Sequence, residues 1–289
     1  MTEKILENFS IAQICESGQC FRMEKITDNR YQTTRTAESY QAATGERYRV
    51  IAGNRYLELE QQGKLVRFDC SEEEYEAFWR HYFDIETDYG ALIARINPND
   101  RYLTAAAGTS DGVRILNQDL WEMIVTFLIS QQNNIVRIRR CIKNICEAYG
   151  ELCVSSGGVK YYAFPTAQAL ADLEEDALMA CNLGYRSKYV VRTAKAVASS
   201  EVDLEWIGSL NYQKARTELL KLFGVGEKVA DCICLFALHH LDAFPVDTHI
   251  RQVLEQHYKR GFPNRRYKGV RGVMQQYIFY YELHGSDKH

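Results

Sequence analysis

The sequence has little that marks a secreted, membrane-spanning or metal-dependent protein. Its first seven residues contain no apolar signal core, and none of its hydrophobic runs is long enough to cross a membrane. Its nine cysteines are an odd number and lack the spacings of zinc sites or of disulfide-rich scaffolds. We therefore expect free thiols in a reducing cytoplasm, no membrane association and no metal ion.

Nucleotide-binding loops, internal repeats and low-complexity segments are also missing. The chain has 289 residues, of which 46% are hydrophobic, so it can bury the core of one large domain or two modest ones. Since no cofactor motif is present, we expect no bound cofactor.

The net charge is −3, so overall charge does not predict binding to nucleic acid. Its distribution is more informative, because basic residues gather in three runs. These are Arg137, Arg139, Arg140 and Lys143; then Arg186, Lys188, Arg192 and Lys195; then Lys259, Arg260, Arg265, Arg266, Lys268 and Arg271. One such run is usually a solvated face, but three runs beside the glycine-rich turn described below favour a surface that follows phosphates.

The N-terminal part of the chain has the pattern of short strands. Residues 48–52, 55–60 and 64–68 are rich in β-forming residues, and turn residues lie between them at Gly53-Asn54 and Gln62-Gly63. These features predict an antiparallel meander with one half-buried face.

From residue 71 the hydrophobic period becomes helical. Ser71 with Glu74, and Asp119 with Glu122, predict capping boxes at helix starts. Further helices are expected over 166–182, 187–199, 211–222, 227–239, 247–258 and 269–283, with a loop over 151–165 and Gly184 as a helix C-cap. The fold class is therefore α+β, with an antiparallel β-rich domain with a flanking helix over 1–115 and a helical domain over 116–289.

The most informative stretch is 219–232, in which a Gly-Val-Gly turn separates two helices. Glycine makes positive φ available at Gly224 and Gly226, and the amides of Val225, Gly226 and Glu227 would begin a helix that favours a phosphate. Lys228 follows on the first turn, where burial would disfavour its ammonium form and make it a candidate nucleophile. A nearby carboxylate, for which Asp247 is the candidate, would orient this amine or stabilise positive charge on a substrate.

Residues 219–249 resemble the helix-hairpin-helix and Gly/Pro-Asp segment of base-excision DNA glycosylases. The segments Gly-Val-Gly-x-Lys-Val-Ala-Asp-Cys-Ile-Cys and Pro-Val-Asp-x-His look specifically like the 8-oxoguanine DNA glycosylase family. The resemblance implies a bifunctional DNA glycosylase/AP lyase that flips 8-oxoguanine, preferably opposite cytosine, out of duplex DNA. Lys228 would then form a Schiff base with the sugar, Asp247 would assist, and β-elimination would follow. The last cysteine is Cys234, so the C-terminal iron–sulfur cluster of some relatives is not expected.

The same resemblance assigns a base pocket. Gly18, in the Ser-Gly-Gln-Cys-Phe-Arg segment 17–22, would approach the damaged base, and Cys232, one turn after Lys228, would pack on one of its faces. Phe279 would stack on the other face, and Gln275 would bind the Watson–Crick edge. Taken alone, each of these residues is as easily explained by a turn, a core position or a surface position.

It also assigns contacts to DNA. Gln132 and Asn133 lie in a polar loop between two apolar helices, which is either an ordinary capped turn or a loop that enters the gap left by the flipped base. Arg137 and Arg186 would bind the cytosine opposite the lesion, and Tyr185 would wedge into the stack unless it is a core-edge residue. His249 would contact a phosphate, as would Val225 and Gly226, unless His249 is a solvated side chain on a helix face.

Two other functions fit parts of the pattern. A helix-hairpin-helix glycosylase for another damaged purine would share the fold but not Lys228, and a non-catalytic DNA-binding module would need neither Lys228 nor Asp247. The expected partner is double-stranded DNA containing 8-oxoguanine, bound by a monomer. The expected location is the nucleoid-containing cytoplasm of a prokaryote or the nucleus of a eukaryote.

Overall fold

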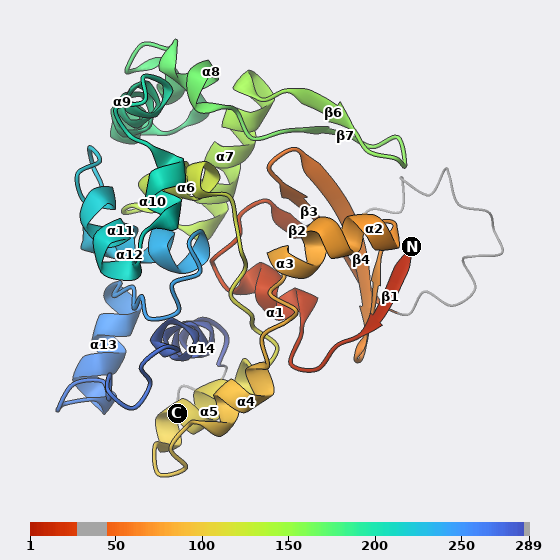
Figure 1. The fold of residues 1–289 in the computed structure, drawn as a ribbon, viewed down its shortest axis with the longest axis vertical. Helices are drawn as coiled ribbons and strands as arrows, with labels where there is room; N and C mark the ends of the chain where they lie inside the picture. Colours follow the sequence, from red (N-terminus) through yellow and green to blue (C-terminus); the bar gives the residue numbers. More distant parts are fainter. Residues whose placement is uncertain (28–44, 286–289) are drawn as a thin grey trace.

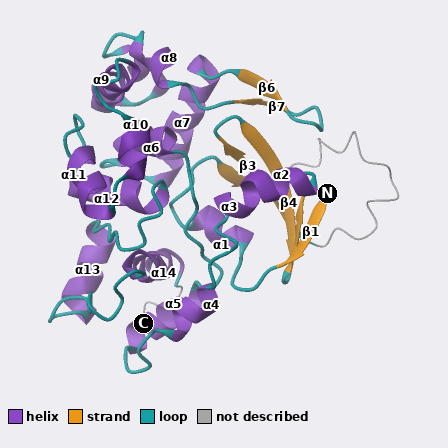
Figure 2. Ribbon diagram, viewed as in Figure 1, coloured by secondary structure: helices purple, strands orange, loops and turns teal. Residues whose placement is uncertain are grey.

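The computed structural model describes residues 1–27 and 45–285. A five-stranded antiparallel sheet lies on one side of the molecule, and most of the helices lie on the other (Figure 1, Figure 2). The strands are β1 (Thr2–Ile5), β2 (Met23–Lys25), β3 (Glu46–Ala52), β4 (Arg55–Gln62) and β5 (Leu65–Phe68), and their order in the sheet is β1-β5-β4-β3-β2. The predicted α+β class is confirmed, and so are the three predicted strands, which are β3, β4 and β5.

Alternation of side chains sets the buried face of this sheet. Val50 pairs with Leu57 across β3 and β4, and Leu59 pairs with Phe68 across β4 and β5. All four side chains are buried. Helix α1 (Ile11–Glu16) covers this face, because Ile11 and Ile14 are buried in the same core. The Ser10 side chain caps its first turn.

Only one of the two hydrogen bonds of each predicted capping box forms. Ser71 accepts a hydrogen bond from the Glu74 amide at the start of α2 (Glu72–Glu74), but the Glu74 carboxylate accepts from Trp79 Nε1 at 2.9 Å. Asp119 likewise accepts from the Glu122 amide, while the Glu122 carboxylate turns to Arg22 in the sheet domain. A side chain one turn later has taken Glu74, and a tertiary contact has taken Glu122, from the role that the local pattern assigns to them at the helix end. After α2 the chain continues through a π-helical turn (Tyr75–Trp79) into α3 (Arg80–Tyr82).

The remaining helices surround a second, larger core. They are α4 (Tyr89–Ala94), α5 (Arg101–Thr109), α6 (Leu120–Ser130), α7 (Ile135–Tyr149), α8 (Ala167–Ala171), α9 (Ser187–Ala198), α10 (Leu204–Ser209), α11 (Tyr212–Leu219), α12 (Glu227–Phe236), α13 (Thr248–His257) and α14 (Arg271–His284). Short 3-10 turns cover Ala177–Cys181 and Gly184–Arg186.

Three local predictions were wrong. The expected loop over 151–165 contains a hairpin of β6 (Leu152–Val154) and β7 (Lys160–Tyr162), whose three-residue strands are too short to show an alternating pattern. The expected helix over 166–182 is α8 followed by the first 3-10 turn. That turn ends at Asn182, whose φ of +67° makes it the C-cap in place of Gly184.

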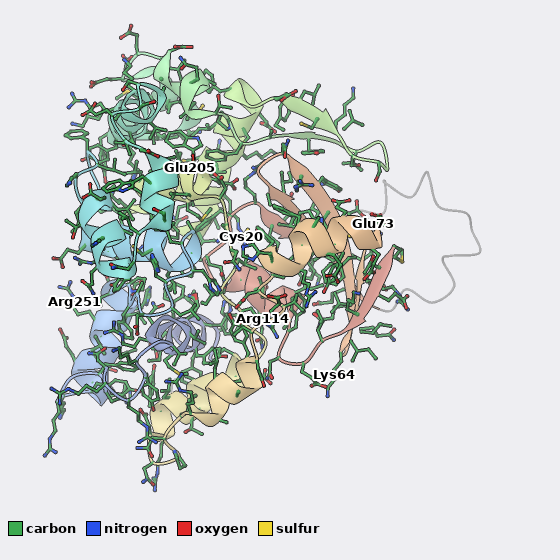
Figure 3. All side chains as sticks on the ribbon, in the orientation of Figure 1. Cys20, Lys64, Glu73, Arg114, Glu205 and Arg251 are labelled. Atoms are coloured by element: carbon green, nitrogen blue, oxygen red, sulfur yellow. The ribbon has the colours of Figure 1, made fainter. Side chains whose placement is uncertain are left out.

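Buried Arg114 ties the two cores together near the centre of the molecule (Figure 3). Its guanidinium donates to the carbonyl oxygens of Asn8 and Asp84 and lies 4.4 Å from the centre of the Tyr89 ring. Helix α5 packs against α14 and so belongs to the core of the helices. The domain boundary between residues 115 and 116 stays a prediction. Within the described ranges, no helix has both the length and the apolar character needed to span a membrane.

Candidate active site and DNA-binding surface

The glycine-rich turn joins α11 to α12 and depends on one of its two glycines. Gly224 has a φ of +89°, and a Cβ placed there would lie 2.7 Å from Cγ of Tyr189. Gly226 has a φ of −96° and is the N-cap of α12. A Cβ there would meet no atom within 4 Å. Gly224 is therefore required by the backbone and by the Tyr189 ring, whereas Gly226 leaves open space in front of the helix.

The structure limits which amides of this turn are free. The Val225 amide donates to the Leu222 carbonyl oxygen at 3.0 Å, so it is already used within the turn, and its side chain is buried. The Gly226 and Glu227 amides have no partner in the part of the chain that the structure describes. They point along the axis of α12 from its N-terminus, where partial positive charge favours an anion.

Lys228 and Asp247 line the same small cavity, together with Cys232. Lys228 is half-buried, and its Nζ lies 5.4 Å from the centre of the Phe127 ring. Burial raises the pKa of the Cys232 thiol to about 11, an effect opposed by the adjacent Lys228 and reinforced by Asp247. The raised pKa leaves Cys232 as an uncharged thiol at neutral pH.

Asp247 is held in place by the helix that it begins. Its Oδ1 accepts from the Ile250 amide at 2.8 Å as the N-cap of α13. Because only one carboxylate oxygen is used in this way, the other can face the cavity. Pro245 fixes the approach of the chain and contributes to the same wall.

Residues from opposite ends of the chain complete the cavity. Gly18 has a φ of +73°, and a Cβ there would lie 2.9 Å from Cε1 of Phe279. The Phe279 ring therefore lies directly over Gly18 in this structure. Gln275 lines the cavity from α14 and is 4% exposed, and its Oε1 has no hydrogen-bond partner among the described residues. His249 is exposed beside Phe279, with ring centres 6.3 Å apart.

The cavity has a volume of about 50 Å³. Because one water molecule occupies about 30 Å³ in the liquid, this space does not admit a purine. Entry of a base requires the Phe279 ring to move away from Gly18.

The polar loop between α6 and α7 is tied to its neighbours. Gln131 Nε2 donates to the Gly224 carbonyl oxygen at 3.0 Å, and Asn133 Nδ2 donates to the Ile129 carbonyl oxygen at 3.1 Å. Gln132 is exposed, has a φ of +48° and accepts from the Tyr185 hydroxyl at 3.4 Å. The loop is thus a strained, hydrogen-bonded projection next to the hairpin.

The two arginines expected to bind the opposite base differ in their exposure and in their partners. Arg137 is exposed on the first turn of α7. Arg186 is 4% exposed and donates to the carbonyl oxygens of Gln131 and Gln132, while its guanidinium lies 4.5 Å from the centre of the Tyr185 ring. Tyr185 itself is 43% exposed. The structure therefore brings Arg186 under the loop as a support, and leaves Arg137 and Tyr185 accessible.

Sequence reasoning missed five residues at this site. Phe127, Phe236, Pro245 and Gln276 line the cavity, and buried Gln19 holds the segment after Gly18 by bonding main-chain atoms of Arg114 and Leu116. Gln276 follows a residue assigned to the pocket, but a helical pattern places the next position on another face. Its involvement depends on the approach of α1, which no local signal predicts.

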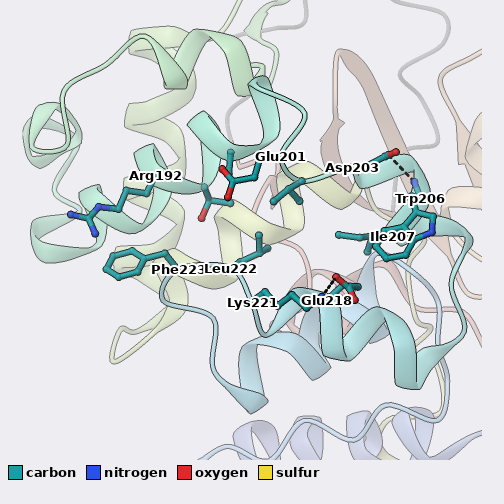
Figure 4. Close-up of a pocket in the computed structure, with 12 residues that line it drawn as sticks. Arg192, Glu201, Asp203, Trp206, Ile207, Glu218, Lys221, Leu222 and Phe223 are labelled. Atoms are coloured by element: carbon teal, nitrogen blue, oxygen red, sulfur yellow. Dashed lines mark hydrogen bonds and ion pairs between the residues drawn. The ribbon is translucent and has the colours of Figure 1, made fainter.

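A larger cavity, of about 450 Å³, lies between α9, α10 and α11 (Figure 4). Its charged rim is engaged in local pairs, such as Lys221 with Glu218 and Arg192 with Glu175. None of the predicted site residues lines it. No group of three or more histidine, cysteine or acidic side chains is placed to hold a metal ion within residues 1–27 and 45–285.

Comparison with known families gives two adjoining matches. The model of the 8-oxoguanine DNA glycosylase N-terminal domain matches residues 3–124, and that of the HhH-GPD superfamily base excision DNA repair protein matches residues 125–271.

Individual relatives agree with these matches. The chain is 31% identical over 271 residues to the N-glycosylase/DNA lyase of Saccharomyces cerevisiae, covering 86% of this chain and 68% of that protein. It is also 31% identical over 204 residues to the probable N-glycosylase/DNA lyase of Methanothermobacter thermautotrophicus, covering 63% of each. The crystal structure of Clostridium acetobutylicum 8-oxoguanine glycosylase/lyase with dsDNA containing cytosine opposite 8-oxoG superposes with a TM-score of 0.85 and 34% identity. That superposition covers 97% of this chain and 94% of that one. The chain therefore belongs to the 8-oxoguanine DNA glycosylase family of the HhH-GPD superfamily of base excision DNA repair proteins.

Proposed function

We propose that the protein is a bifunctional DNA glycosylase/AP lyase that removes 8-oxoguanine from duplex DNA and then nicks the strand. The observation that carries this proposal is the convergence of Lys228, Asp247 and Cys232 with Gly18 and Phe279 around one cavity. An amine beside a carboxylate at the mouth of an aromatic-lined slot fits nucleophilic displacement of a base from its sugar.

The reaction starts when the damaged nucleotide leaves the stack, which costs a few kcal/mol. In its neutral form Lys228 Nζ attacks C1′ of the deoxyribose, the C1′–N9 bond breaks, and the base departs with its bonding electron pair and takes up a proton. Opening of the sugar ring leaves an imine between C1′ and Nζ. Loss of a proton from C2′ then expels the 3′ phosphate, which completes β-elimination and nicks the strand.

Asp247 supports this sequence electrostatically. A carboxylate fixed as the N-cap of α13 cannot turn away, so its negative charge stays near C1′ as positive charge develops on the sugar. It also orients the amine for attack. A side chain held by its own helix needs little reorganisation during the reaction.

Selection of the base rests on a single proton. Guanine has an unprotonated N7, whereas 8-oxoguanine carries hydrogen there, and the Gly18 carbonyl oxygen is the proposed acceptor. Cytosine opposite the lesion is the proposed preferred partner, bound by Arg137. Arg186 joins this contact if its bonds to the Gln131 and Gln132 carbonyl oxygens are exchanged for bonds to the base.

A strand-cleavage assay tests the proposal against its alternatives. The substrate is duplex DNA carrying 8-oxoguanine opposite each of the four bases in turn. We expect the strand to be cleaved without added alkali and fastest when cytosine is opposite the lesion. Lys228→Gln should abolish this cleavage. A glycosylase for another purine would leave this substrate intact and release an alkylated base from DNA that carries one. A binding module would release no base from either DNA.

A further inference from the structure

Two neighbouring glutamines of α14 place unsatisfied acceptors beside the cavity. Gln275 is 4% exposed and Gln276 is 2% exposed, and both line the cavity. The side-chain oxygen Oε1 of each is buried and has no hydrogen-bond partner among the described residues. Folded proteins rarely leave such groups unpaired, because the lost hydration is not recovered. Two unpaired acceptors at one cavity therefore call for a ligand that brings donors.

The amide of Gln276 has a defined orientation. Its Nε2 donates to the Ser17 carbonyl oxygen at 3.2 Å. Because a carbonyl oxygen only accepts, the amide nitrogen must face Ser17 and the oxygen must face away from it. Ser17 is itself fixed, since its hydroxyl donates to the Ile14 carbonyl oxygen at 2.8 Å and accepts from Gln19 Nε2 at 2.8 Å. The free oxygen of Gln276 is thus held in position before any base arrives.

The chemistry of the bases identifies which ligand satisfies two acceptors. On the Watson–Crick edge of a guanine-type base, the N1–H group and the exocyclic 2-amino group are adjacent donors. An adenine-type base presents an acceptor at N1 and carries hydrogen at C2. Paired acceptors at Gln275 and Gln276 therefore match a guanine-type edge and are left unpaired by an adenine-type edge.

We propose that Gln276 is a second specificity-determining residue, which accepts a hydrogen bond from the 2-amino group of the flipped base while Gln275 accepts from N1–H. This inference rests on the proposed function, because it assumes that 8-oxoguanine enters the cavity after Phe279 moves. A base without the 2-amino group leaves the Gln276 oxygen buried and unpaired. Sites built to pair with a substrate donor reject analogues that lack it by a factor of at least roughly 10 to 100.

A different role for Gln276 must be separated from this one. Through Ser17 it also supports the backbone next to Gly18, so a substitution could slow excision only by displacing the Gly18 carbonyl. Such a structural effect acts on every base that enters. A direct contact to the 2-amino group acts only on bases that carry it, so the ratio of two rates distinguishes the roles.

The test compares single-turnover excision of 8-oxoguanine with that of 8-oxohypoxanthine, which lacks only the 2-amino group, each opposite cytosine. We expect the wild-type protein to prefer 8-oxoguanine by at least roughly 10-fold. Gln276→Met, which nearly conserves side-chain volume, is expected to bring the ratio close to one. Gln275→Met is the matched control: N1–H is present in both bases, so both rates should fall and the preference should remain.

A second variant keeps the test decisive if Gln276→Met folds poorly. Gln276→Leu also removes the acceptor oxygen, and we expect it to bring the ratio close to one. The proposal is overturned if the wild type does not distinguish the two bases, or if a folded Gln276→Met or Gln276→Leu variant keeps the full preference. Failure of the wild type to release 8-oxoguanine at all would instead contradict the proposed function.

Discussion

Gly18 shows how single residues define this site. Its left-handed backbone lines the cavity, and its missing side chain lets the Phe279 ring close over it. Gln19, the next residue, is anchored by both ends of its side-chain amide, so the backbone at Gly18 is rigid. Selectivity that depends on one proton needs such rigidity, because a mobile carbonyl group could avoid the unprotonated N7 of guanine.

Gly18→Ala is expected to lower the free energy of unfolding by about 1–2 kcal/mol, because a left-handed conformation is unfavourable for alanine. The rate of excision should fall by more than the loss of folded protein explains, because the new methyl group displaces Phe279. Urea denaturation and single-turnover excision measure the two effects. Gly63→Ala is the control, since Gly63 also has a positive φ, of +61°, but no atom within 4 Å of an added Cβ. Equal excision by the two variants would contradict the assignment.

The sequence predicts some residues of the site better than others. Lys228 and Asp247 lie in a compact local pattern, so their types and spacing are visible without a structure. Arg186 is different: it was expected to contact DNA, whereas its partners in this structure are main-chain carbonyl groups of a loop more than 50 residues away. Main-chain partners leave no trace in residue types, so this support could not be predicted.

At the scale of elements, one aromatic ring connects two parts of the proposed DNA-binding surface. Tyr189 on α9 packs against Gly224 of the hairpin and lies 5.7 Å, ring centre to ring centre, from Tyr185. The hairpin also receives a hydrogen bond from Gln131. The hairpin, Tyr185 and the polar loop are thus fixed relative to one another, which would lower the cost of ordering them when DNA binds.

A pair of substitutions in the hairpin separates folding from binding. Gly224→Ala combines backbone strain with a clash against Tyr189, so we expect it to lower the free energy of unfolding by about 2–3 kcal/mol. Gly226→Ala has an ordinary φ and open space, so its cost in stability should stay below about 1 kcal/mol. Its methyl group, however, stands where a phosphate would approach, and DNA affinity should fall by about 10-fold. Thermal unfolding measures the stability of the two variants, and fluorescence anisotropy measures their affinity for DNA. Unchanged affinity of folded Gly226→Ala would exclude the hairpin as a phosphate site.

Hydrophobic periodicity in the sequence predicted the positions of several long helices and strands. Strands β3 and β4 and helices α6, α7, α9 and α12 carry strong patterns, and all were predicted. Helix α10 and the β6–β7 hairpin were missed, because elements of three to six residues show too few repeats of a period. Tertiary contacts, such as Glu122 with Arg22, then decide details that local capping rules leave open.

At the scale of the whole molecule, a polar cluster around buried Asp84 joins the sheet to the helices. Asp84, just after α3, accepts from the Thr87 and Tyr89 hydroxyls, and Nε2 of His239, after α12, lies 3.2 Å from its Oδ2. Burial alone would raise the pKa of Asp84, but His239 and the two hydroxyl donors together hold it below its ordinary value. The cluster therefore favours the ionised carboxylate.

The pH dependence of stability follows from this direction. Because the pKa of Asp84 is lower in the folded than in the unfolded protein, its contribution is present above about pH 4 and is lost as the pH falls through the folded value. Asp84→Asn should reduce the free energy of unfolding by about 2 kcal/mol at pH 7. The difference from the wild type should shrink below about pH 4. Urea denaturation across this range checks it, with exposed Glu201→Gln as control; a difference that stays constant into acid would refute the linkage.

The central claim is that Lys228 becomes covalently bonded to the sugar, and mapping the trapped adduct tests it most directly. The protein is incubated with duplex DNA carrying 8-oxoguanine opposite cytosine in the presence of borohydride, which reduces an imine to a stable amine. The conjugate is then digested and its peptides are identified by mass spectrometry. We predict a single deoxyribose adduct on Lys228, which disappears in Lys228→Gln. An adduct on another amine, or release of the base with no adduct at all, would contradict the account.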